Sequence, residues 1–293
     1  MIIRLSALSM TVVLLFAGCA SNQKPELKWT ASKIRTVTGF RTPECVVVDD
    51  ANDRTYVSNV DAAKDEYWSD DGKGFISLLH ADGGVRKYRW AATSVGTPLH
   101  GPKGMCLLGG YLYFNDNTRL MRCSADGGDR IEVVAEGFKK ANDLATDGHN
   151  VWVTDTAAGK VYSVTPRGEK RAILAPESIN GITFHLGRLY GVSWDLHDLY
   201  ELDPHGVVPP KPFGLAKHFT NLDGIEVLAD GTFLVSDFMG GAVYTVSPNR
   251  KDVMLLAKLD SPADIGLGSN GALLYVPQFF ENHVVIYSLA KKR

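Results

Sequence analysis

Apolar and polar residues alternate along short segments of this chain, and pairs of such segments are joined by tight turns. Residues 221–238, NLDGIEVLADGTFLVSDF, contain one alternating run, an Asp-Gly turn and a second alternating run. Alternation with a period of two predicts half-buried β-strands, and Asp-Gly between two runs predicts a hairpin. The segment is therefore interpreted as a β-hairpin that carries a carboxylate, Asp223, near its start.

Five further segments align with this hairpin, at residues 43–59, 102–116, 141–155, 179–194 and 262–278. Most of them are followed by a third apolar run, such as 159–166 or 241–248, and then by a fourth, such as 252–259. The positions aligned with Asp223 are separated by 59, 39, 38, 43 and 40 residues. A period near 40 with four strands in each unit is typical of a propeller blade. The sequence thus predicts an all-β fold, a six-bladed β-propeller.

The two ends of the repeat region are expected to meet. The last repeat stops after its third strand, at residues 283–290, while an unassigned strand, residues 33–40, precedes the first repeat. If the N-terminal strand is the outer strand of the last blade, the ring closes without an unpaired edge. The long first interval is explained by a polar loop at residues 60–74, and the propeller domain is expected to span 33–293.

The first 32 residues have a different character. They contain Arg4, an apolar run shorter than the roughly 20 residues that cross a bilayer, and small residues leading to Cys19. Residues 16–19, FAGC, resemble a bacterial lipobox, whose cysteine is lipidated and begins the mature protein; an ordinary secretory signal is the alternative. We expect a signal peptide over 1–18, a lipid anchor at Cys19 and a polar tether over 19–32. The protein is then membrane-attached in the cell envelope, and because Ala20 follows the cysteine, at the periplasmic face of the outer membrane in a Gram-negative cell.

Charge and cysteine content exclude several classes of protein. The formal net charge is -2 and no long basic run is present, which argues against nucleic acid as a partner. Cys45, Cys106 and Cys123 lack zinc-type spacing and are expected to be buried thiols, with a single disulfide between an unspecified pair left open. The GxSxG, HExxH and P-loop motifs are absent, so the sequence does not support a serine hydrolase, a zincin or a P-loop protein.

The repeat places one residue of each blade in a ring. The first strand of a propeller blade lines the central channel, so the residues aligned with Asp223 are expected at the channel mouth. Two carboxylates and two amide oxygens in this ring suit a hard cation such as Ca²⁺, which would offset the cost of burying Asp223. A metal-free channel filled by water and internal hydrogen bonds is the other interpretation. The predicted ring consists of Glu44, Lys103, Asn142, Asn180, Asp223 and Ala263.

The ring and its flanking motifs are PE in blade one, AND in blade three, NG in blade four and DG in blade five. Over residues 33–290 they resemble the SMP-30/gluconolactonase/LRE-like family of six-bladed propellers. The resemblance implies that Glu44, Asn180 and Asp223 hold one divalent cation, with Asn142 helping to hold metal or substrate. Ca²⁺ fits best, and Zn²⁺ or Mn²⁺ are alternatives. It further implies hydrolysis of a lactone or ester, with Asp223 as general base and Lys140 binding the oxyanion or a polar substrate group.

The chain also departs from the family pattern. Lys103 stands in the ring, where an ammonium weakens cation binding unless it points away or meets a carboxylate. We expect Lys103, Trp194 and His197 to contact substrate. The loops at 193–198 and 237–241 offer aromatic and apolar surface, which argues against a sugar lactone. Two functions remain open: an envelope-anchored hydrolase of a small lactone or ester, or a non-catalytic propeller that binds a protein or glycan partner.

Acidic residues at the ends of second strands are interpreted as structural. Asp155 and Asp237 recur at the same place in their repeats as Asn59. Short polar side chains at such positions commonly accept hydrogen bonds from nearby backbone amides. We therefore predict that Asp155 and Asp237 cap turns.

Overall fold

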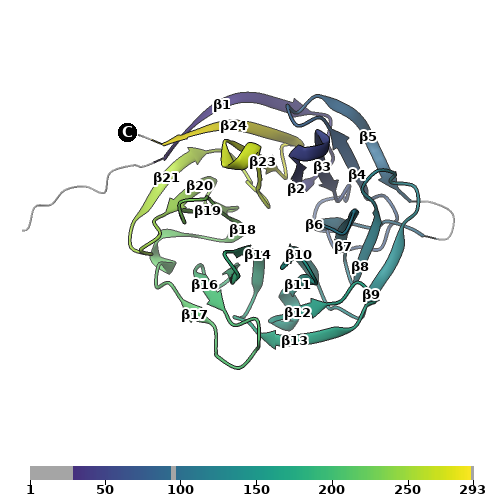
Figure 1. The fold of residues 1–293 in the computed structure, drawn as a ribbon. Coiled ribbons are helices and arrows are strands. Elements are labelled where there is room, and N and C mark those ends of the chain that lie inside the picture. The colour runs from purple at the N-terminus through teal and green to yellow at the C-terminus, as the bar shows by residue number, and fades with distance from the viewer. Residues whose placement is uncertain (1–28, 94–96, 292–293) are drawn as a thin grey trace, which may run out of the picture.

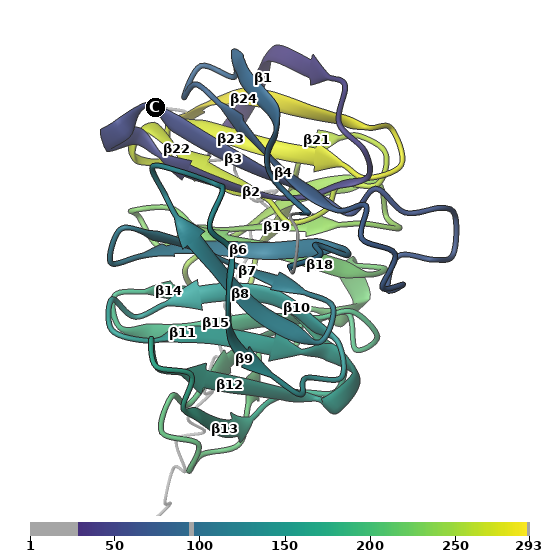
Figure 2. The ribbon, with the colours of Figure 1, turned by 90° about the vertical axis from the view of Figure 1, so that its right-hand side faces the viewer.

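The fold is a closed ring of β-sheets around a central channel. A computed structural model describes residues 29–93 and 97–291 and contains six antiparallel sheets of four strands each (Figure 1). Strands β2, β6, β10, β14 and β18 lie nearest the centre, and neighbouring blades pack face to face when the ring is viewed from the side (Figure 2). The predicted six-bladed β-propeller is confirmed.

The strand bounds follow the repeat. Blade one contains β2 (Pro43–Asp49), β3 (Arg54–Asn59), β4 (Phe75–Leu79) and β5 (Val85–Ala92). Blade two contains β6 (Pro102–Leu108), β7 (Tyr111–Asp116), β8 (Arg119–Ser124) and β9 (Glu132–Glu136). Blade three contains β10 (Ala141–Thr146), β11 (Val151–Asp155), β12 (Lys160–Val164) and β13 (Lys170–Leu174).

Blade four contains β14 (Ile179–His185), β15 (Arg188–Ser193), β16 (Leu199–Leu202) and β17 (Lys211–Pro212). Blade five contains β18 (Leu222–Val227), β19 (Phe233–Asp237), β20 (Ala242–Val246) and β21 (Val253–Lys258). Blade six contains β22 (Gly266–Gly268), β23 (Leu273–Gln278), β24 (His283–Lys291) and β1 (Trp29–Thr38). Short 3-10 helices are η1 (Asp50–Asn52), η2 (Thr156–Ala158), η3 (Ala216–His218) and η4 (Ser269–Gly271).

Strand β1 closes the ring as the sequence predicted. It pairs antiparallel with β24, from Trp29 opposite Lys291 to Thr38 opposite His283, and so covers an edge that would otherwise be unpaired. The strand begins at Trp29, which corrects the predicted tether: residues 29–32 belong to the propeller because they pair with the end of β24. The predicted signal peptide, the rest of the tether and Cys19 lie outside the described residues.

Apolar side chains from facing sheets fill the spaces between blades. Tyr56, Tyr113 and Tyr275 occupy equivalent positions in their second strands and are almost fully buried. Their hydroxyls find partners: Tyr56 donates to the carbonyl of Ala125 at 2.7 Å, and Tyr275 donates to the carbonyl of Ala81. These tyrosines therefore pack the blades together, as expected for large side chains with one polar atom.

A row of buried carboxylates fixes the start of the inner strands. We name Asp116, Asp155 and Asp237 the turn-clamp carboxylates. Asp237 accepts hydrogen bonds from the amides of Thr220 and Asn221 at 2.8 Å and of Gly240 at 3.0 Å.

The other two turn-clamp carboxylates act in the same way. Asp155 accepts from the amides of Lys139 at 2.8 Å and Lys140 at 2.9 Å, and Asp116 accepts from those of His100 and Gly101. The predicted capping role of Asp155 and Asp237 agrees with these contacts. These three clamps hold the chain just before Lys103, Asn142 and Asp223.

The segment between β3 and β4 is a loop, as predicted: residues 60–74 contain no helix or strand. Across the part of the chain that the structure describes, no helix has the length and apolar character needed to span a bilayer. Cys45, Cys106 and Cys123 are buried and free, which leaves the possible disulfide without support.

Candidate functional site

Backbone bulges place the ring residues. In five inner strands the pairing with the second strand shifts register at the ring position, for example between Pro43 and Val46 and between Leu222 and Ile225. A regular strand sends consecutive side chains to opposite faces, whereas a bulge redirects them. The bulges therefore allow both the ring residue and the residue after it to face the channel.

The structure brings the predicted ring together. Glu44, Asn142, Asn180 and Asp223 come from β2, β10, β14 and β18 and line one cavity of about 460 Å³. All four are buried, at 4–9% exposure. Ala263 supplies no polar group and is fully buried beside them. Four oxygen-bearing side chains from separate blades thus converge at the base of the cavity.

A chain of side-chain hydrogen bonds links three of these residues. The Asn142 amide nitrogen donates to Asn180 Oδ1, and the Asn180 nitrogen donates to Asp223 Oδ1 at 3.0 Å. Thr156 orients the first member, because its Oγ1 accepts from Asn142 at 3.3 Å and donates to the Ile179 carbonyl at 2.8 Å. The two amides are held across the channel with their polar ends toward the carboxylate.

Glu44 is the least satisfied member of the ring. Its Oε2 is buried and has no hydrogen-bond partner among the described residues. Burial raises the pKa of Glu44 well above its ordinary value; the charge of Asp223 adds to this shift, and that of Lys103 opposes it. An unpartnered carboxylate oxygen in an enclosed site is costly, and a bound cation or a proton would relieve the cost.

Asp223 titrates near neutrality in this setting. Burial and, to a smaller extent, the charge of Asp143 raise its pKa to about 7, against the opposing effect of the hydrogen bond from Asn180. A carboxyl with a pKa near the working pH exists in both protonation states, which suits a group that exchanges a proton with substrate or water.

Lys103 stands in the ring but is held by neutral oxygens. Its ammonium donates to the carbonyls of Tyr67 and Gly101 at 3.0 Å and to Asn117 Oδ1 at 3.1 Å. It also lies 4.0 Å from the centroid of the Trp68 ring. Burial lowers its pKa to about 8, against the opposing effect of Glu44. Three fixed acceptors therefore anchor this cation, and none of them is a ring carboxylate.

The other predicted substrate contacts divide into two groups. Lys140 and Trp194 line the cavity, as expected, together with Asp195. His197 is not among the residues that line the cavity, so its predicted contact with substrate stays a prediction. Its amide donates to the Ser193 carbonyl at 3.1 Å and its φ is +57°, so the loop folds back on itself at this residue.

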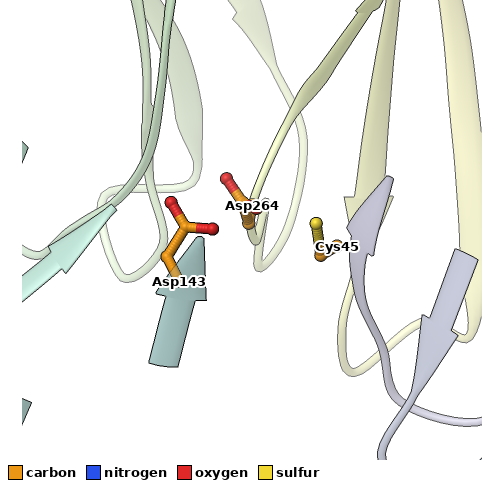
Figure 3. Close-up of side chains that lie close together, drawn as sticks. All are labelled: Cys45, Asp143 and Asp264. Atoms are coloured by element: carbon orange, nitrogen blue, oxygen red, sulfur yellow. The ribbon is translucent and has the colours of Figure 1, made fainter. Parts of the chain in front are cut away.

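Sequence reasoning missed a second layer of acids below the ring. The residues one position after Glu44, Asn142 and Ala263 are Cys45, Asp143 and Asp264, and their side chains point toward one another in the channel (Figure 3). All three are buried, and a potential ligand atom of each lies within 4.8 Å of the others. The residue pattern gives no sign of this layer, because the register shifts that turn Cys45 and Asp143 inward appear only in the structure.

Glycines make room for these acids. A β-carbon on Gly104 would lie 2.5 Å from Asp143 Oδ1, and one on Gly224 would lie 2.6 Å from Asp264 Oδ1. Burial raises the pKa of Asp143 to about 7, and burial together with the charge of Asp143 raises that of Asp264 well above its usual range. The layer is therefore a set of close carboxyls that resist simultaneous ionisation.

The ring residues have the chemistry of a cation site. Two carboxylates and two amides offer oxygen ligands only, which suits Ca²⁺ better than a soft metal. Glu44 Oε2 is free to coordinate, and Asp223 has only one described hydrogen-bond donor. The donor set and the unpartnered oxygen both fit one divalent cation held by Glu44, Asn142, Asn180 and Asp223.

Comparisons with known proteins bear on the fold. No protein-family model and no curated protein matches the chain. Among solved structures, a streptogramin B lyase is similar, with a TM-score of 0.62 and 12% identity, over 90% of this chain and 98% of that one. A candidate gluconolactonase has a TM-score of 0.66 and 19% identity, over 90% and 93%. An inactive virginiamycin B lyase from Staphylococcus aureus with quinupristin has a TM-score of 0.58 and 14% identity, over 90% and 100%. The chain thus shares its fold, over almost its whole described length, with proteins of this kind.

Proposed function

We propose that this protein is a divalent-cation-dependent hydrolase of small lactones or esters. One observation carries the proposal: two buried carboxylates, Glu44 and Asp223, meet at the base of an open cavity with raised pKa values and an unpartnered oxygen. Solved structures of similar fold also support the proposal, because they include a candidate gluconolactonase and a streptogramin B lyase.

Glu44, Asn142, Asn180 and Asp223 would hold the cation, and Ca²⁺ is the one their oxygens favour. When bound, such a cation polarises a carbonyl group and makes a bound water more acidic. The amide chain from Asn142 through Asn180 to Asp223 fixes the side chains before any ligand arrives. A preformed site loses little free energy to reorganisation during the reaction.

Asp223 acts as the general base in this proposal. The oxygen of a water molecule forms a bond to the carbonyl carbon while Asp223 takes one of its protons. The acyl carbon–oxygen bond then breaks, and the leaving alkoxide recovers a proton from the Asp223 carboxyl. Lys140, exposed at the cavity rim and free of ion pairs among the described residues, stabilises the oxyanion that forms on the carbonyl oxygen.

The test is a hydrolysis assay on chelator-treated protein. A panel of lactones and phenyl esters is assayed with and without added Ca²⁺, Mn²⁺ or Zn²⁺. We expect metal-dependent turnover that Asp223→Ala reduces by at least a thousandfold, and that Lys140→Ala reduces by about ten- to a hundredfold. Turnover that survives both chelation and Asp223→Ala would refute the assignment.

A second candidate function rests on Lys103. A buried ammonium in the ring disfavours a cation nearby and suits a channel face that binds a partner without catalysis. A protein or glycan partner would then contact the cavity rim. Lys103→Met separates the two functions: it should strengthen metal binding if the site is a cation site, and leave the protein unable to bind metal if it is not.

We also propose that the propeller is anchored in the cell envelope through Cys19. The support is the FAGC segment and the short apolar run before it. Mature protein should begin at a lipidated Cys19 and partition into detergent, whereas Cys19→Ser should remove both the lipid mass and the membrane fraction. Membrane association that persists in Cys19→Ser would contradict the anchor.

A further inference from the structure

One side of the cavity is a continuous aromatic surface. Tyr67, Trp194, Phe238, Phe279 and Phe280, which we name the aromatic wall, come from four separate loops and all line the cavity. Their rings are in contact: the centroids of Tyr67 and Phe279 are 5.0 Å apart, those of Phe279 and Phe280 5.4 Å, and those of Trp194 and Phe238 5.5 Å. The wall is one surface rather than scattered side chains.

Part of this surface is left open to the cavity. Phe280 is 50% exposed, and Met239 beside the wall is 61% exposed. Large apolar side chains that stay exposed while lining a concave site mark a place where apolar ligands bind. Phe238 and Phe279 are buried behind them and support the wall from beneath.

Most polar groups around the cavity are already engaged. Lys103 uses its ammonium on three acceptors, Thr156 both donates and accepts, and Asp195 accepts from the Ser178 hydroxyl. Lys140 also lines the cavity, and its ammonium lies 5.2 Å from the centroid of the Trp68 ring with no hydrogen-bond acceptor recorded among the described residues. A substrate with many hydroxyl groups would therefore bury several of them without partners, which is unfavourable.

We infer that the substrate is a lactone or ester with a bulky alkyl or aryl substituent, rather than a polyhydroxylated sugar lactone. The inference rests on the proposed function. The carbonyl group lies at the ring, between Asp223 and Lys140, and the apolar substituent lies against the aromatic wall. Binding strength then comes from apolar burial, and the few free polar groups are reserved for the reacting carbonyl.

The main experiment uses the full chain loaded with Ca²⁺ and a series of γ-lactones with alkyl chains of increasing length, with glucono-1,5-lactone for comparison. We expect kcat/KM to rise about threefold for each added methylene group until the wall is covered. Phe280→Ala should lower kcat/KM at least tenfold for the long-chain lactones and less than about twofold for the shortest lactone. Leu186→Ala, an exposed apolar residue that does not line the cavity, is the matched control and should change neither. A flat or falling series, or preference for the sugar lactone, would overturn the inference.

A binding experiment keeps the inference testable if no lactone is hydrolysed. The probes are two γ-lactams, which resist hydrolysis: pyrrolidin-2-one and its 5-hexyl derivative. Binding of the hexyl lactam at least tenfold tighter than the parent lactam, weakened by Phe280→Ala, supports an apolar subsite even when the proposed hydrolase activity fails. Equal affinities for the two lactams would reject the subsite while leaving the proposed function untouched.

Discussion

Two sets of buried carboxylates in this propeller have opposite surroundings. The turn-clamp residues Asp155 and Asp237 each accept three backbone N–H bonds, so their negative charge is stabilised within the chain. In the ring, Asp223 accepts one hydrogen bond from Asn180, and Glu44 Oε2 accepts none among the described residues. Burial is therefore not what distinguishes the two sets; hydrogen bonding is.

This difference in hydrogen bonding separates carboxylates with a structural role from carboxylates at the candidate functional site. A carboxylate with a full set of backbone donors contributes to folding and has no need of a ligand. A buried carboxylate without donors destabilises the protein until a proton or cation arrives, and such groups concentrate at functional sites. The clamps hold the inner strands in place, and the rigid strands keep the ring oxygens that lack hydrogen-bond donors close together.

The largest expected effect comes from breaking a clamp. Asp237→Ala removes the acceptor for three backbone amides, so we expect a loss of about 3 kcal/mol in the free energy of unfolding. Denaturant unfolding with and without Ca²⁺ measures it, and the loss should be the same in both. Full rescue by Ca²⁺ would place Asp237 with the ring instead.

The second effect is a decrease of about 2 kcal/mol in the free energy of unfolding as the pH rises. Burial raises the pKa of Asp223 and Asp143 to about 7 and that of Glu226 to about 8. Because these values exceed the unfolded ones near 4, the folded state binds more protons, and the stability they contribute is lost as pH rises from about 5 to 8.

Unfolding of chelator-treated protein across this range tests the sign. The free energy of unfolding should fall by about 2 kcal/mol in total between pH 5 and pH 8. Saturating Ca²⁺ should flatten the decline, since a cation displaces protons from Glu44 and Asp223. A stability that rises from pH 5 to 8 in the chelator-treated protein would contradict the account.

The smallest effect is a difference between two conservative variants, whose changes in the free energy of unfolding should have opposite signs. In chelator-treated protein at pH 8, Asp223→Asn should raise the free energy of unfolding by about 1 kcal/mol, because it removes a charge whose desolvation is not offset. Asp237→Asn should lower it, because an amide replaces an acceptor of three N–H bonds. Equal effects of the two variants in thermal unfolding would abolish the distinction between ring and clamp.

Much of this arrangement could be predicted from the sequence, for physical reasons. Hairpins of alternating residues, repeated with a period near 40, define the blades. The edge of β24 requires a pairing partner, and this predicted that the N-terminal strand is the outer strand of the last blade. The ring residues could be predicted because equivalent positions in the blades of a propeller face the same central channel. Asp155 and Asp237 were identifiable because strand-end carboxylates beside turns accept backbone hydrogen bonds.

The remainder depends on tertiary contacts that alignment cannot reveal. Asp143 faces the channel at a register shift in β10, and such a shift cannot be recognised from the residue types around it. Tyr67 lines the cavity from a loop without regular structure, whereas His197, a residue with left-handed backbone in another loop, does not line it. Loop conformation decides these positions, and single residues in a loop carry little information about it.

The central claim is that the ring holds one divalent cation, and calorimetric titration of Ca²⁺ into the chelator-treated full chain tests it most directly. The parent protein should bind one Ca²⁺ per chain, and Asp223→Ala should show no binding. Asp126→Ala, which removes an acid whose side chain is 83% exposed, should bind as the parent does. Absence of binding by the parent, or the same binding by Asp223→Ala, would contradict the account.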